Sequence, residues 1–124
     1  MRPRPVPLAA SLALAVLVSG FTCRRGDDPA AAQVAAGAAL YVSRCEACHR
    51  ADDAEGPRLT EQLIRSYGSA RALFDYTRMS MPWDAPGTLS DEEYWRVTAY
   101  LVASRNLDLP RPLDSATADS VRFH

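Results

Sequence analysis

The chain has 124 residues, a length that fits one domain. It contains no lysine, and its 14 arginines against 15 acidic residues give a formal net charge of −1. This balance excludes the strongly basic character of a nucleic-acid-binding domain. The lack of lysine also excludes a docking face ringed by lysines.

The N-terminus has the pattern of an export signal. Arg2 and Arg4 precede an apolar run over residues 6–21, which contains Pro7 and is shorter than the ~20 residues of a membrane span. We therefore predict a signal peptide over residues 1–22. The alternative is an N-terminal membrane anchor that is retained. Both predictions place the rest of the chain outside the cytoplasm, in the periplasm.

Cys23 directly follows this apolar run, in a position that resembles the lipid-modified cysteine of bacterial lipoproteins. Acylation of Cys23 would tether the protein to a membrane face. The alternative is a cysteine that is discarded with the signal peptide. Residues 23–30 are polar, contain glycine and proline, and indicate a short flexible tether.

The spacing of apolar residues predicts helices and gives no alternation of period two, so the expected fold class is all-α. A first helix is expected over residues 31–44. Three more are expected, each opened by a hydroxyl cap, from Thr60 to Tyr67, from Ser69 to Arg78 and from Ser90 to about Arg105.

Prolines and glycines mark the segments between and after these helices. Residues 79–87 contain two prolines and a glycine and are expected to form a loop. Pro110 and Pro112 predict a restricted C-terminal tail over residues 107–124, with a weak final helical turn. The expected domain therefore covers residues 31–106.

The motif Cys45-x-x-Cys48-His49 carries the clearest chemistry. Two thiols at this spacing can add to the two vinyl groups of one haem, and the adjacent histidine then ligates the iron, as in c-type haem attachment. A zinc site would need four nitrogen or sulfur ligands, and beyond this motif only Cys23 and His124 remain. A thioredoxin-like redox pair would need a βαβ context, and the sequence predicts none.

The second axial ligand of the iron is expected to be Met81. The only histidine besides His49 is the last residue, His124, so a methionine is favoured. Met79 and Met81 both lie in the predicted loop, and Pro82 fixes the backbone directly after Met81. Met79 remains the first alternative, and an open or exogenous sixth position the second. Ligation by His and Met would raise the reduction potential.

Groups around the ligands are expected to orient the histidine and to meet the haem propionates. His49 needs an acceptor for its other ring nitrogen, and a carbonyl in the Gly56-Pro57 turn is a candidate. Further candidates lie in the second predicted short helix and the following loop: Tyr76, Trp83, Arg78 and Arg71.

These residues resemble a class I c-type cytochrome over residues 34–106. The resemblance implies three to four helices wrapped around one covalently attached haem c, with the first and last helices crossing at Gly37. It implies that Tyr41 and Tyr100 pack at this crossing. It also implies that Pro57 orients the axial histidine, and it supports Met81 as the methionine ligand. The segment 81–91 is similar to small cytochromes that accompany periplasmic dehydrogenases.

The expected function is single-electron transfer between redox proteins, with the iron cycling between Fe(II) and Fe(III), and not enzymatic catalysis. From residue 23 on, 12 arginines and 15 acidic residues give a net charge of about −3, which suits a basic partner such as a dehydrogenase, another cytochrome or an oxidase. No small-molecule substrate is evident. One alternative is a haem subunit of a larger dehydrogenase complex, and another is a sensor or enzyme with a displaceable methionine.

Overall fold

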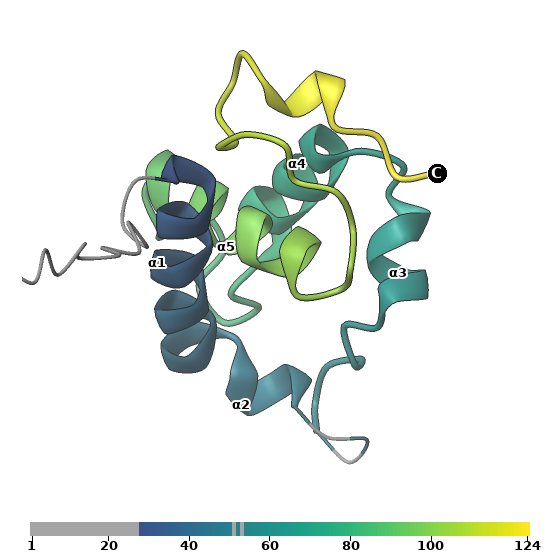
Figure 1. Ribbon diagram of the computed structural model, residues 1–124. Coiled ribbons are helices and arrows are strands. Elements are labelled where there is room, and N and C mark those ends of the chain that lie inside the picture. The colour runs from purple at the N-terminus through teal and green to yellow at the C-terminus, as the bar shows by residue number, and fades with distance from the viewer. Residues whose placement is uncertain (1–27, 51, 53) are drawn as a thin grey trace, which may run out of the picture.

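The computed structural model describes residues 28–50, 52 and 54–124, and this part of the chain is helical (Figure 1). Its elements are α1 (Pro29–Arg44), α2 (Glu46–His49), α3 (Glu61–Ser66), α4 (Ala70–Ser80), α5 (Asp91–Ala103) and the 3₁₀ helix η1 (Ala118–Ser120). Within the described residues there is no β-strand, and no helix is long and apolar enough to cross a membrane. The all-α prediction is therefore confirmed. The predicted signal peptide and Cys23 lie outside the described residues.

Side-chain caps set the helix starts where the sequence predicted them. The hydroxyl groups of Thr60, Ser69 and Ser90 accept hydrogen bonds from backbone amides in the first turns of α3, α4 and α5. Ser90 and Glu93 form a complete capping box, with the Glu93 carboxylate accepting from the Ser90 amide at 2.8 Å. These bonds satisfy amides that would otherwise lack an acceptor inside the helix.

The predicted loop over residues 79–87 is wrong at its first two positions, because α4 continues through Ser80. Met79 therefore lies in the last turn of a helix. Met81 has an extended backbone, with φ −127° and ψ 150°. Pro82 accounts for this end of the helix, because the residue before a proline is sterically pushed out of the helical region.

Helices α1 and α5 cross at close range, as Figure 1 shows on the left of the molecule. A Cβ atom placed on Gly37 would lie 1.9 Å from the carbonyl oxygen of Arg96, so only glycine fits. One turn further along α1, the rings of Tyr41 and Tyr100 pack with their centroids 5.1 Å apart. This crossing places Tyr41, in the last turns of α1, against Tyr100 in the last turn of α5.

The predicted boundary at residue 107 does not mark the edge of the packed core. Leu113, Val121 and Phe123 are buried, and the C-terminal segment returns over α4 in Figure 1. The amide group of Gln33 in α1 bonds to both the carbonyl and the amide of Leu113, at 2.7 and 2.8 Å. The prolines restrict this segment, but its spaced apolar residues attach it to the helices.

Candidate functional site

Cys45 and Cys48 lie at the junction of α1 and α2 as free, half-buried thiols. Burial, followed by the proximity of Cys48, raises the pKa of Cys45 to about 11. A catalytic thiol of the thioredoxin kind has a lowered pKa instead. The raised pKa keeps the Cys45 thiol protonated at neutral pH, which is unlike the activated thiol of a redox disulfide.

The ring of His49 is oriented by a single backbone acceptor. Its Nδ1 atom lies 2.7 Å from the carbonyl oxygen of Pro57. Because a carbonyl can only accept, Nδ1 carries the hydrogen and donates it, and Nε2 keeps its lone pair. Nε2 is therefore the atom that can ligate a metal, with its tautomer fixed by Pro57.

Gly56 makes this orientation possible. A Cβ atom at Gly56 would lie 2.7 Å from Cε1 and 2.9 Å from Nδ1 of His49, closer than carbon atoms pack. The Gly56 amide also donates to the carbonyl of Cys48 at 2.9 Å, which closes the loop onto α2. Gly56 thus allows the turn to approach the ring of His49 closely, and Pro57 supplies the carbonyl that accepts a hydrogen bond from this ring.

Met81 follows α4, and both its backbone amide and its backbone carbonyl make hydrogen bonds. Its amide donates to the carbonyl of Thr77 at 2.9 Å, and its carbonyl accepts from the hydroxyl of Tyr94 at 2.6 Å. The side chain of Met81 is half-buried, whereas that of Met79 is 73% exposed. The contact of Tyr94 with Met81 was not predicted from the sequence.

The two aromatic candidates for the surroundings of the haem differ in their environment. The ring of Tyr76 packs against Tyr67 of the α3 end, with centroids 5.2 Å apart. Trp83 is 81% exposed. Tyr76 is therefore held by a neighbour from another element, while Trp83 lies on the surface of the loop that follows Met81.

The two arginine candidates already have charged or aromatic neighbours. Arg78 donates from Nε to the carboxylate of Asp91 at 2.6 Å, which joins the end of α4 to the start of α5. Arg71 pairs with Asp75 at 3.9 Å and lies over the ring of Trp95, 5.9 Å from its centroid. The structure therefore gives both arginines contacts that stabilise helix packing.

Comparison with known proteins adds independent evidence. A family model described as cytochrome c oxidase, cbb3-type, subunit III matches residues 32–101. A thiosulfate dehydrogenase from Allochromatium vinosum is 36% identical over 90 residues, which are 62% of this chain and 32% of that relative. The chain thus spans about a third of the length of the curated relative. No solved structure matches the chain significantly.

Proposed function

Because the chain belongs to the cytochrome c family described as cbb3-type cytochrome c oxidase subunit III, we propose that it carries single electrons through one covalently attached haem c. Family membership makes it a class I c-type cytochrome, whose haem serves electron transfer. Beyond family membership, we propose one haem per chain, its covalent attachment and the identity of both axial ligands.

The described residues fit such a haem. Cys45 and Cys48 would supply the two thioether bonds, since both are free thiols at the required spacing. His49 would ligate the iron through Nε2, and the bond from its Nδ1 to the carbonyl of Pro57 is the observation that carries the assignment. Met81 would be the second axial ligand. When bound, the haem supplies an iron that takes up and releases one electron.

The anchoring of Met81 favours a carrier over a ligand-binding sensor or enzyme. Thr77 and Tyr94 bond to the amide and the carbonyl of Met81. Because these bonds fix the backbone of Met81, they oppose displacement of its side chain from the iron by another ligand. Tyr76 and Trp83 would lie near the haem propionates. Arg78 would lie near them as well, while it pairs with Asp91.

A second candidate function is that of a haem subunit within a dehydrogenase complex. The observation that favours it is the relative, a thiosulfate dehydrogenase of which this chain spans 32%. In both cases the partners are redox proteins, and the net charge of about −3 from residue 23 on would suit a basic docking face. We further propose export to the periplasm, with anchoring by lipid at Cys23 or by a retained N-terminal segment.

A potentiometric titration of the haem-loaded protein, combined with a haem-to-chain ratio, tests the carrier function. We expect one haem per chain and a reversible one-electron curve, because the motif occurs once and both ligands are held in place. An irreversible curve, or a ratio of two haems per chain, would contradict the proposal. Purification from native membranes as a free protein, and not as part of a complex, separates the carrier from the subunit.

A further inference from the structure

Helix α5 connects the two parts of the chain that carry the proposed iron ligands. It packs against α1, which leads into Cys45 and His49, and against α4, which ends directly before Met81 (Figure 1). On the α1 side, Gly37 allows the two backbones to approach closely at Arg96. The position of Met81 relative to His49 therefore depends on how α5 holds the segment that follows α4.

A hydrogen bond joins α5 to the backbone of Met81. The hydroxyl of Tyr94, in the first turn of α5, donates to the carbonyl of Met81 at 2.6 Å. The bond from the amide of Met81 to the carbonyl of Thr77 is the i to i−4 bond that closes the last turn of α4. That bond fixes Met81 relative to its own helix. The Tyr94 bond, by contrast, fixes Met81 relative to α5.

The ring of Tyr94 is itself held in place. It is 1% exposed, and it meets the ring of Phe74 in α4 edge-on, with centroids 6.4 Å apart. Its backbone directly follows the capping box of Ser90 and Glu93, and its amide donates to the carbonyl of Ser90 at 3.0 Å. A hydroxyl on a ring that packing restrains in this way keeps its acceptor in position.

A second contact between the end of α4 and the start of α5 is more exposed. Arg78 pairs with Asp91 at 2.6 Å, but the two side chains are 51% and 66% exposed. Exposed ion pairs contribute little to stability, because water screens the charges. The bond from the buried Tyr94 is therefore the stronger of these two links between α5 and the end of α4.

We propose that Tyr94 is a positioning residue for the iron, whose hydroxyl holds Met81 where its thioether can ligate; this inference rests on the proposed function. Without the bond, ligation would first have to order the segment that follows α4, so Met81 would bind the iron more weakly. Because ligation by methionine raises the midpoint potential, weaker ligation would also lower it.

A titration of ferric, haem-loaded Tyr94→Phe with imidazole tests this role, because imidazole binds only where Met81 has left the iron. The substitution removes the hydroxyl and keeps the ring that packs on Phe74. We expect imidazole to bind about tenfold more tightly than to the unsubstituted protein, the lower end of the effect of groups that orient metal ligands. The charge-transfer absorbance of thioether-bound ferric iron should weaken, and the midpoint potential should fall.

Two control variants separate positioning from a loss of stability. Tyr100→Phe removes a hydroxyl from the same helix, on a ring that packs against Tyr41. Val121→Ala removes buried methyl groups from the C-terminal segment, where the carbonyl of Val121 accepts from the amide of Ala70 at the start of α4. Val121→Ala should lower the thermal unfolding temperature. Both variants should bind imidazole as the unsubstituted protein does.

A double variant shows whether the hydroxyl acts through Met81. In the Met81→Ala background, adding Tyr94→Phe should leave the affinity for imidazole unchanged, because the thioether that the hydroxyl positions is no longer present. Equal tightening by Tyr94→Phe in both backgrounds would overturn the positioning role.

The unsubstituted protein distinguishes a failure of this inference from a failure of the proposed function. If its ferric form lacks the thioether absorbance, ligation by Met81 is overturned, and the role of Tyr94 with it. If the absorbance is present and Tyr94→Phe leaves the affinity for imidazole unaltered, only the role of Tyr94 is overturned.

Discussion

Replacing Met81 with alanine is expected to convert the iron from low-spin to high-spin and to open it to carbon monoxide in the reduced state. The variant loses the thioether ligand but keeps the backbone bonds to Thr77 and Tyr94, so the surrounding loop should keep its position. The midpoint potential should fall by on the order of 0.1 V, within the ~0.8 V range that axial ligands control. Optical spectra and potentiometry measure both effects.

Met79→Ala is the matched control for this prediction. Met79 lies two residues earlier, in the last turn of α4, and is 73% exposed. Its replacement removes the same side chain without touching the proposed ligand, so the low-spin spectrum should persist. A high-spin spectrum in Met79→Ala together with a low-spin spectrum in Met81→Ala would reverse the ligand assignment.

Replacing both Cys45 and Cys48 with serine is expected to abolish covalent haem attachment completely. A serine hydroxyl cannot form the thioether bond, and the described part of the chain has no other cysteine to substitute for this pair. Haem should then be extracted by acidified organic solvent, and the denatured chain should show no haem stain. The two single variants should each retain one thioether bond and part of the stain.

Cys23→Ser is the control for this second prediction, because Cys23 lies before the haem motif and outside the described residues. Its covalent haem content should equal that of the unsubstituted protein. If haem stayed covalently bound in the double variant, attachment through Cys45 and Cys48 would be refuted.

Local signals in the sequence were sufficient for the helices and for the haem motif. Thr60, Ser69 and Ser90 cap helices because the hydroxyl and the amides it bonds lie within four residues of each other. The end of α4 was missed, because the loop was expected from Met79 on, although Pro82 restricts only the residue directly before it.

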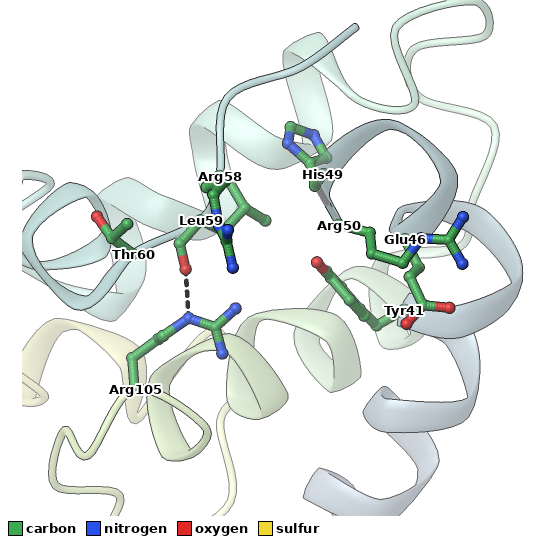
Figure 2. Close-up of a pocket in the computed structure, with 8 residues that line it drawn as sticks. All are labelled: Tyr41, Glu46, His49, Arg50, Arg58, Leu59, Thr60 and Arg105. Atoms are coloured by element: carbon green, nitrogen blue, oxygen red, sulfur yellow. Dashed lines mark hydrogen bonds between the residues drawn. The ribbon is translucent and has the colours of Figure 1, made fainter. Parts of the chain in front are cut away.

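Contacts between distant segments could not be predicted in the same way. The bond from Tyr94 to the carbonyl of Met81 spans 13 positions, and the contact of Gln33 with Leu113 spans 80. The pocket beside His49 in Figure 2 likewise joins Tyr41 to Arg105 only after α1 and α5 have crossed at Gly37. Such sites depend on packing, and no spacing rule in the sequence indicates them.

The optical spectrum of the reduced, unsubstituted protein, recorded with and without carbon monoxide, tests the central claim most directly. A closed carrier ligated by His49 and Met81 predicts a low-spin spectrum that carbon monoxide leaves unchanged. A high-spin reduced iron that binds carbon monoxide would contradict this ligation and would favour ligand-binding chemistry at an open iron.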